Sequence, residues 1–321
     1  MANSINTNYG ANIALQNLNA TNRALETTQN RINTGKAINS AKDNGAIWSI
    51  AQNQTTQMNA LDAVKQSLQR GQSTIDVAMA AGETVKDVLG QMKNLVLAAS
   101  DPGVDAASLD AYEEDFKNLA NQITTTIKGA SFNGVNMVAG ATATVAGKSL
   151  KALASADGKN TIDVSGVNFA LHAPADATAG AGTTANNNAE AITAGAGIRL
   201  ASSSFTAVRA EAKTAADLGT TVGETSRVTA WSDLMKQVDD SISYVTSSLT
   251  KLGTGSKSLD NQLTFTSKLQ DTLETGIGNL VDADLAKESA KLTALQTKQQ
   301  LGVQALSIAN SSSSVLLSLF R

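Results

Sequence analysis

Apolar residues along much of the chain recur at alternating steps of three and four, the spacing that gives a helix one continuous apolar face. The clearest series in the first half ends just before Asp101-Pro102-Gly103, a turn-forming breaker. A shorter series resumes after the turn, so we expect the two helices to form an antiparallel hairpin. The first series is Leu61, Val64, Leu68, Gly71, Ile75, Ala78, Gly82, Val85, Leu89, Met92, Val96 and Ala99, and the second is Leu109, Tyr112, Phe116, Leu119, Ile123 and Thr126.

Both ends of the chain carry further helical patterns. The N-terminal one is weak because two of its positions are polar: Ala11, Leu15, Leu18, Asn22, Leu25, Gln29 and Ile32. The C-terminal one would form a rod of roughly 75 Å at 1.5 Å per residue. Its positions are Trp231, Met235, Val238, Ile242, Val245, Leu249, Leu252, Ser256, Leu259, Leu263, Thr266, Gln270, Leu273, Ile277 and Leu280. We expect Gly253 and Gly255 to loosen this rod locally.

Beyond Leu280 the apolar residues no longer fall on one stripe. A helix that is apolar on several faces needs burial on several sides, and a chain of this size offers little to cover it. The pattern therefore indicates burial by neighbouring copies.

The middle of the chain, from about 141 to 221, reads differently. Residues 175–197 are mostly Ala, Gly, Thr and Asn, and short alternating pieces upstream are typical of strands or hairpins. We expect a small β-containing insert between long helices that come from both chain ends. The fold class is thus mainly α, a long antiparallel coiled coil or helical bundle built from both termini with a β-containing insert in the middle.

Composition supports thin helical cores, since aromatic residues are only 3% of the 321 residues and only two prolines interrupt the chain. Without cysteine there is neither a disulfide nor a thiolate metal site. A net charge of -3 gives no basic footprint for nucleic acid or anionic membranes. No apolar run approaches a membrane span, and the N-terminus lacks the features of a secretory signal.

Candidate chemistry is sparse. The single histidine, His172, excludes two-histidine zinc motifs, and no phosphate-binding glycine loop is present. The acidic run Glu113, Glu114 and Asp115 reads as a solvated helix face because adjacent residues on a helix point in different directions. We assign no catalytic, cofactor-binding or metal-binding residue and expect no enzyme activity. Heptads alone leave open a self-contained helical bundle that acts as a soluble binding module.

Motifs at both ends resemble bacterial flagellins. Near the start stand Ser4-Ile5-Asn6-Thr7-Asn8 and Arg31-Ile32-Asn33-Thr34-Gly35-Lys36, followed by Ile38-Asn39-Ser40-Ala41-Lys42-Asp43. Ser131-Phe132-Asn133-Gly134-Val135 is similar to the turn that closes the family's N-terminal helical region, and Val315-Leu316-Leu317-Ser318-Leu319-Phe320-Arg321 resembles the family's ending. The resemblance covers about residues 1–137 and 225–321.

The resemblance implies a structural subunit that polymerises helically into the flagellar filament for motility. Residues 1–45 and 279–321 would form an inner coiled-coil domain lining the filament channel. Residues 46–140 and 222–278 would form a rod-like domain, and 141–221 the outward variable domain. The residues expected to pack subunits together are Leu15, Leu18, Leu25, Ile32, Leu285, Leu292, Leu295, Leu301, Val303, Leu306, Ile308, Leu316, Leu319 and Phe320.

Partners follow from the same resemblance: other copies of the chain, sister flagellins, an export chaperone, the filament cap and hook–filament junction proteins, with no nucleic acid and no membrane. The protein would be secreted to the extracellular flagellum by the flagellar export apparatus without a cleaved signal. No cofactor is expected.

A segment that resembles the family's innate immune receptor epitope comprises Leu89, Gln91, Met92, Lys93, Asn94 and Leu95. Gln91 and Asn94 replace an Arg and a Glu of the usual pattern, which removes charge-assisted contacts. We therefore expect weak binding of the Toll-like receptor.

Departures also occur at Asp43-Asn44-Gly45-Ala46-Ile47-Trp48, where the link between the inner and rod domains is expected to differ locally. A hook–filament junction protein, related at both ends, is the nearest rival, and a flagellin with an enzymatic insert is a third reading. The compact insert and the ending favour a filament subunit.

Overall fold

The computed structural model describes residues 8–140, 147–171, 198, 205–206, 208–210 and 221–318. The chain divides into two compact units: Met1–Ala60 with Lys268–Arg321, here the terminal unit, and Leu61–Ser267, the central unit. Long helices from both chain ends and one small antiparallel sheet confirm the predicted fold class. The elements are α1 (Tyr9–Thr34), α2 (Ala41–Ala99), α3 (Ala106–Gly129), β1 (Leu150–Leu153), β2 (Thr161–Val164), α5 (Thr221–Val281) and α6 (Leu285–Ser318).

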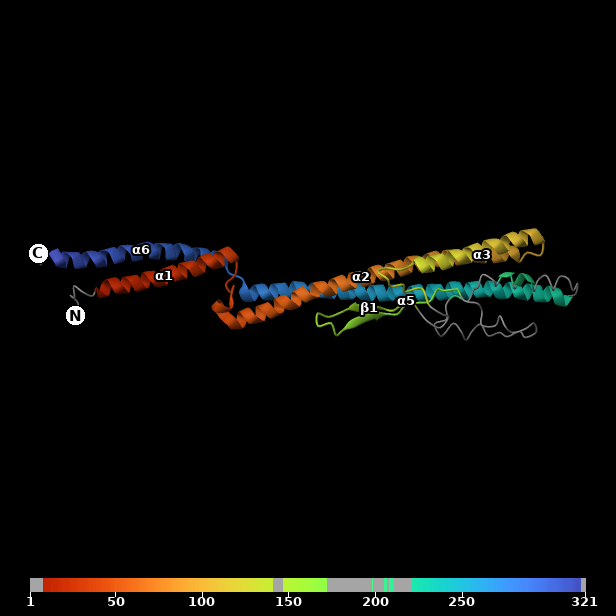
Figure 1. The fold of residues 1–321 in the computed structure, drawn as a ribbon, viewed down its shortest axis with the longest axis horizontal. Helices are drawn as coiled ribbons and strands as arrows, with labels where there is room; N and C mark the ends of the chain where they lie inside the picture. Colours follow the sequence, from red (N-terminus) through yellow and green to blue (C-terminus); the bar gives the residue numbers. More distant parts are fainter. Residues whose placement is uncertain are drawn as a thin grey trace. The chain divides into compact units, whose positions relative to one another are not determined.

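In the terminal unit, α1 and α6 lie side by side in opposite directions (Figure 1). Asn8 caps the start of α1 by accepting a hydrogen bond from the Ala11 amide, and Gly35 ends it in the left-handed conformation. The side chain of Asn8 also donates to the carbonyl of Ala309, 2.7 Å away. The two helices therefore pair along nearly the whole of α1.

The face that α1 turns toward α6 differs from the predicted stripe. Ala11, Leu18, Leu25 and Ile32 are half-buried as expected, but Leu15, Asn22 and Gln29 are exposed. The positions one residue earlier, Ala14, Thr21 and Thr28, are the ones that turn inward. Small side chains there let the helix backbones approach while α6 supplies leucines, so the small residues and not Leu15 complete the seam.

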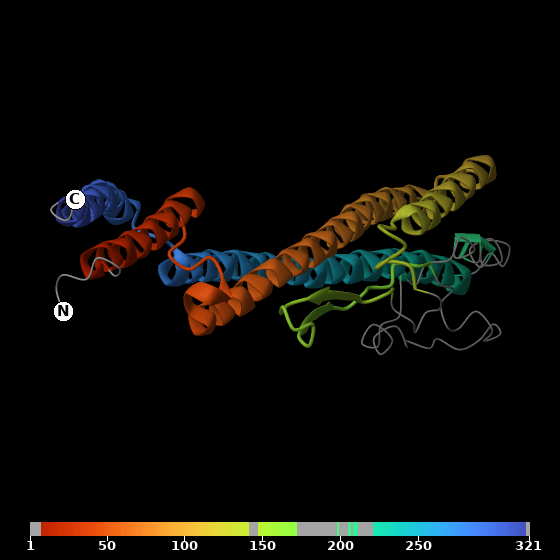
Figure 2. The same ribbon diagram turned by 60° about the vertical axis from the view of Figure 1, so that its left-hand side comes forward.

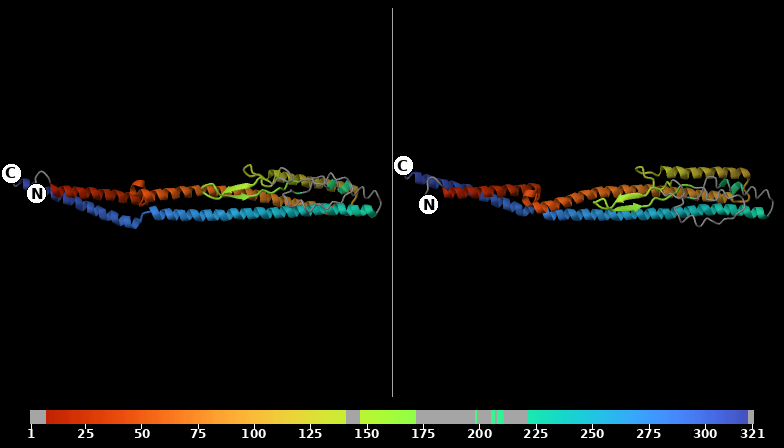
Figure 3. Two further views of the ribbon diagram at one scale, coloured as in Figure 1. Left: turned by 90° about the horizontal axis from the view of Figure 1, so that it is seen from below. Right: turned by 60° about the horizontal axis from the view of Figure 1, so that its bottom comes forward.

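In the central unit, α2, α3 and α5 share one apolar core, and α3 runs back along α2 after the Asp101–Gly103 turn (Figures 1 and 3). Asp105 caps α3 by accepting from the Ser108 amide. Every position of the predicted α2 stripe is buried, from Leu61 to Ala99. The predicted helical hairpin is thus confirmed.

The stripe of α5 is wider than predicted. Trp231, Val238, Val245, Leu252 and Leu259 are buried as expected. The residues between them that lie deepest are Leu234, Ser241 and Ser248, whereas the predicted Met235, Ile242 and Leu249 are only half-buried. Partners on more than one side of α5 explain the broad stripe.

The β-hairpin packs along α5 in the central unit (Figure 2). Leu150 of β1 pairs with Val164 of β2, and Val164 and Phe169 are buried in the core. Two helix glycines make room for them: a Cβ at Gly255 would lie 2.6 Å from Val164 Cγ1, and one at Gly82 would lie 2.9 Å from Phe169 Cε2. The expectation that Gly255 loosens α5 is wrong, because α5 runs unbroken past it and the glycine seats the hairpin.

A short helical stretch at 205–206 and 208–210 anchors to α3 and α5. The Phe205 ring lies 5.3 Å from that of Phe116 and 5.1 Å from that of Trp231. Beside it, Thr206 donates to Glu113 at 2.6 Å and Arg209 pairs with the same carboxylate. Glu113, expected on a solvated face, is instead buried because this returning segment covers it.

The finer division of the chain at 45/46, 140/141, 221/222 and 278/279 stays a prediction. Local breaks occur at Asn44, whose backbone is not helical, and between α5 and α6 at residues 282–284.

Candidate assembly surface

Exposed large apolar side chains concentrate in the terminal unit. Among the described residues, only Leu97, Val228 and Phe265 of the central unit belong to this group. The members in the terminal unit are Tyr9, Ile13, Leu15, Trp48, Ile50, Leu280, Leu285, Leu301, Val303 and Ile308. Exposed apolar side chains that gather into a patch mark an interaction site.

The residues predicted to pack subunits together separate into two groups. Leu18, Leu25, Ile32, Leu292, Leu295 and Leu306 are half-buried between α1 and α6. Leu15, Leu285, Leu301, Val303 and Ile308 are exposed, Ile308 to 70%. The backbone of Leu316 belongs to α6, whereas Leu319 and Phe320 lie outside the described residues.

Two stripes run along α6 on roughly opposite sides of the helix. The first faces α1: Glu288, Leu292, Leu295, Gln299, Gly302, Leu306 and Ala309 are all buried or half-buried. The second contains Ala290, Ala294, Thr297, Leu301, Ala305 and Ile308, and every member is exposed. No charged residue belongs to the second stripe, so α6 presents an uncovered apolar surface with heptad-like spacing.

The exposed surface of α1 is mostly polar. It carries Asn12, Gln16, Asn19, Arg23 and Asn30, although the apolar Tyr9, Ile13 and Leu15 are exposed as well. The two helices of the pair therefore differ: α1 has one seam and a mostly polar outer surface, while α6 has a seam on one side and an apolar stripe on the other.

Backbone and side-chain contacts join the end of α1 to the start of α6. The Ala37 amide donates to the Val281 carbonyl at 2.7 Å, and the Ala283 amide donates to the Gly35 carbonyl at 2.9 Å. Inside this joint, Arg31 of α1 donates to Glu288 Oε1 at 3.0 Å.

Lys291, on the same helix, lies 3.9 Å from the other carboxylate oxygen of Glu288. The cross-helix partner Arg31 was missed. The signal that would have found it is a charged residue on the inward stripe of each helix.

The segment that resembles a receptor epitope lies on α2. Leu89 and Met92 are fully buried in the core of the central unit, whereas Gln91 and Asn94 are exposed. Lys93 pairs with Asp239 of α5 at 2.7 Å. Only part of the predicted segment is thus free to meet a partner.

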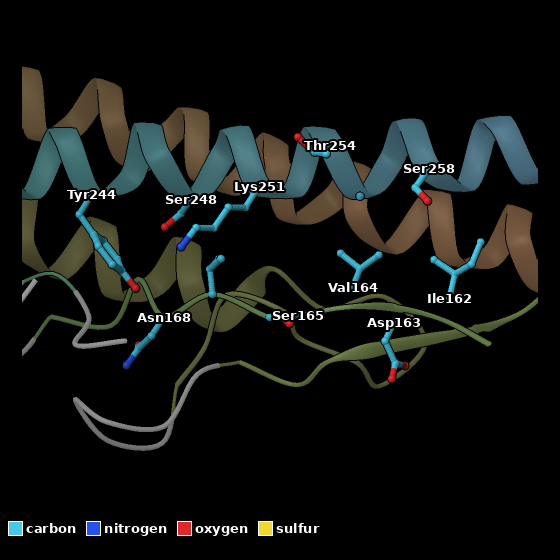
Figure 4. A pocket seen from close by; sticks show the side chains of 13 residues that line it. Ile162, Asp163, Val164, Ser165, Asn168, Tyr244, Ser248, Lys251, Thr254 and Ser258 are labelled. Carbon is cyan, nitrogen blue, oxygen red and sulfur yellow. The ribbon is translucent and has the colours of Figure 1, made fainter. Parts of the chain in front are cut away.

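A polar groove of about 440 Å³ lies between the hairpin and α5 (Figure 4). Asp163 and Ser165 line one side, and Lys251 and Tyr244 the other. Burial raises the pKa of the Tyr244 hydroxyl above its ordinary value. Hydroxyls, the Asp163 carboxylate and one lysine give this groove hydrogen-bonding groups.

Within the described part of the chain, no three His, Cys, Asp or Glu residues gather closely enough to hold a metal ion. None of the helices described combines the length and apolar character that a membrane-spanning segment needs. His172 lies outside the described residues.

Comparison with known proteins bears on the same surfaces. Residues 5–143 match the bacterial flagellin N-terminal helical region, and residues 235–320 match the bacterial flagellin C-terminal helical region. The chain is 50% identical to flagellin FljM of Caulobacter vibrioides over 319 residues, which is 99% of both chains. It is 36% identical to flagellin C of Rhizobium meliloti and 32% identical to a flagellin of Brucella melitensis, again over 99% of each chain.

Proposed function

The chain belongs to the bacterial flagellin family, and we propose that its terminal unit is the element through which copies dock in the filament. As a flagellin it is a structural protein that polymerises with copies of itself into the extracellular flagellar filament. The proposal concerns which residues make that polymer. It assigns the contact between copies to the outer stripe of α6, whose large side chains are Leu301 and Ile308.

One observation carries this assignment: the outer stripe is apolar, free of charge and uncovered. Burial of a large apolar side chain contributes roughly 1.5–3 kcal/mol of favourable free energy, which the stripe does not gain while it stays in water. A second copy of the chain covers it without any new partner. Contacts of this type that do not close on themselves propagate as a helix.

The finer roles follow from family membership. We assign residues 1–45 and 279–321 to the inner part of the filament and 141–221 to its outer surface. Sister flagellins, an export chaperone, the filament cap and junction proteins are the remaining partners, and export occurs without a cleaved signal. The protein acts by assembly and not by catalysis.

The first test is growth of purified protein on sheared filament seeds, followed by negative-stain electron microscopy. Intact protein should form long filaments, and a variant lacking residues 279–321 should form none. Soluble intact protein whose two ends resist protease completely would instead identify a self-contained bundle.

A second test separates the outer stripe from the rest of α6. Leu301→Asp and Ile308→Asp each place a charge on the stripe without touching the α1 seam, so both should block growth. Asn19→Asp adds the same charge to the polar face of α1 and should leave growth intact. If Asn19→Asp blocks growth as strongly, added charge in general is responsible and the stripe has no special role.

For the receptor segment we propose weak binding of the innate Toll-like receptor. Gln91 and Asn94 lie on the exposed side of α2 but carry no charge, while Leu89 and Met92 are held in the core. The variant Gln91→Arg/Asn94→Glu should increase the response of a receptor reporter cell above that of the unmodified protein. An unmodified response equal to that of a consensus flagellin would contradict the proposal.

A further inference from the structure

Two different faces of α6 could pack against α1. Because α6 carries an apolar stripe on each of two sides, the hydrophobic effect alone does not decide which stripe turns toward α1. If the outer stripe faced α1, Leu301 and Ile308 would be buried within the subunit and could not contact a second copy. A feature that selects one face of α6 is therefore required if the outer stripe is to remain free for a second copy.

Polar contacts distinguish the two stripes. Glu288 and Gln299 interrupt the inner one, and each meets a matched group on α1: Arg31 at 3.0 Å and Asn22 at 2.8 Å. The glycine of the same stripe, Gly302, lies against Leu18. The outer stripe has no carboxylate or amide to offer to Arg31 and Asn22.

The Arg31–Glu288 pair is the more deeply placed of the two polar contacts. Glu288 is 8% exposed and Arg31 is half-buried, whereas Asn22 is exposed. Turning the other face of α6 inward would leave the Arg31 charge near Ala290, which offers it no hydrogen-bond acceptor on its side chain. Loss of one partner of a charge-assisted hydrogen bond at a desolvated site is costly, so the pair penalises the wrong face.

The position of Glu288 strengthens this argument. The backbone bonds of the joint end at Ala283, before α6 begins at Leu285. Glu288 is the first buried residue of α6, one turn into the helix. The rotation of α6 about its axis is thus first constrained at this side chain.

We propose that the Arg31–Glu288 ion pair selects the face of α6 that packs on α1 and so keeps the outer stripe available for a second copy. Both are positioning residues, since neither belongs to the outer stripe. This inference rests on the proposed role of that stripe in assembly.

The absence of cysteine makes a direct test possible. Two double-cysteine variants show which face of α6 packs on α1 in seeded filaments. In Leu25→Cys/Leu295→Cys a disulfide forms when the observed face packs on α1, and in Leu25→Cys/Ala294→Cys it forms when the alternative face does. Leu25 and Leu295 both lie on the seam, between the Asn22–Gln299 and Arg31–Glu288 contacts. With the ion pair intact, disulfide yield should favour the 25–295 pair.

Each cysteine pair is then combined with Arg31→Leu/Glu288→Leu. The preference for 25–295 should fall by about tenfold, the equilibrium change expected from one charge-assisted hydrogen bond, or filament growth should fail. The exchanged pair Arg31→Glu/Glu288→Arg should restore both preference and growth. As a matched control, Lys93→Leu/Asp239→Leu removes an ion pair between α2 and α5 and should change neither.

Normal filaments with an unchanged cross-linking preference in Arg31→Leu/Glu288→Leu would overturn the inference, as would failed growth that the exchanged pair does not restore. The proposed role of the outer stripe is judged separately, by whether Leu301→Asp and Ile308→Asp block growth while Asn19→Asp does not.

Discussion

The central and terminal units use the same heptad spacing but bury their apolar side chains to different extents. In the central unit, Phe116, Phe169 and Phe205 are fully buried with aliphatic residues from three helices and a hairpin. Among the described side chains of the terminal unit, those buried belong to Thr21, Thr28, Ala51, Val281 and Glu288, none of them aromatic, and several large apolar side chains are exposed. One chain thus combines a unit that completes its own core with a unit that does not.

Geometry accounts for this difference. Two helices can cover only one face of each other, so a third of each surface at most is removed from water in an isolated pair. In the central unit, α5 has α2, α3 and the hairpin around it, which buries a stripe two residues wide. Stability of the central unit should therefore be a property of the single chain, and that of the terminal unit a property of the polymer.

The largest expected effect is a cavity in the central unit. Phe116→Ala should lower the free energy of unfolding of the soluble chain by about 3–5 kcal/mol, because a fully buried ring is removed. Chemical denaturation followed by circular dichroism measures this loss. The counterpart in the terminal unit, Ile308→Ala, should change unfolding by less than about 0.5 kcal/mol and yet reduce seeded filament growth. Equal destabilisation by both variants would contradict the comparison.

A smaller effect is expected from glycines within helices. Gly82→Ala should destabilise the soluble chain by about 1–3 kcal/mol, since its Cβ would lie 2.6 Å from Leu249 Cδ2 in the closed core. Gly90 in the same helix has no atom within 4 Å of the corresponding position, so Gly90→Ala should stabilise by roughly 0.5–1 kcal/mol.

Thermal denaturation of both glycine variants measures these changes. Gly302→Ala extends the measurement to the terminal unit, where only the flexible end of Leu18 stands 3.3 Å away. It should behave like Gly90→Ala, and a loss as large as that of Gly82→Ala would show that the α1–α6 seam is as tightly closed as the core.

The smallest effect concerns pH. Hydrogen bonds from Lys117, Thr206 and Arg209 hold the pKa of Glu113 at about 2, below its ordinary 4.5. Because the folded-state pKa is lowered, this carboxylate contributes stability above pH 4.5 and loses it as the pH falls through about 2. The contribution is about 1–2 kcal/mol after allowance for solvent screening.

Urea unfolding of the soluble chain between pH 5 and pH 2 measures this contribution. Glu113→Gln should reduce the slope of the free energy of unfolding against pH. The same substitution at its exposed neighbour, Glu114→Gln, should leave that slope as in the unmodified protein. If the free energy of unfolding depends on pH identically in Glu113→Gln and the unmodified chain, Glu113 does not contribute to the pH dependence.

Sequence periodicity predicted the buried stripe of α2 from Leu61 to Ala99 residue for residue, because the core of the central unit encloses that stripe. It predicted α1 and α5 only in part. Along α1, and along α5 as far as Ser248, every second position of the stripe lies one residue earlier than expected, at Ala14 and Thr21 in α1 and at Leu234 and Ser241 in α5. Size misled the prediction, since larger residues at the margin of a face look more core-like than small residues at its centre.

By itself, the sequence determined the helical class, the pairing of the two chain ends, the hairpin of α2 and α3, and membership of a polymer-forming family. These depend on local periodicity and short motifs, which each segment carries independently of its neighbours. Tertiary structure alone decided that Glu113 is buried under a returning segment, that helix glycines seat a β-hairpin, and that Arg31 meets Glu288 across the α1–α6 seam. These contacts join residues far apart in the chain, and their energies depend on which surfaces are brought together and removed from water.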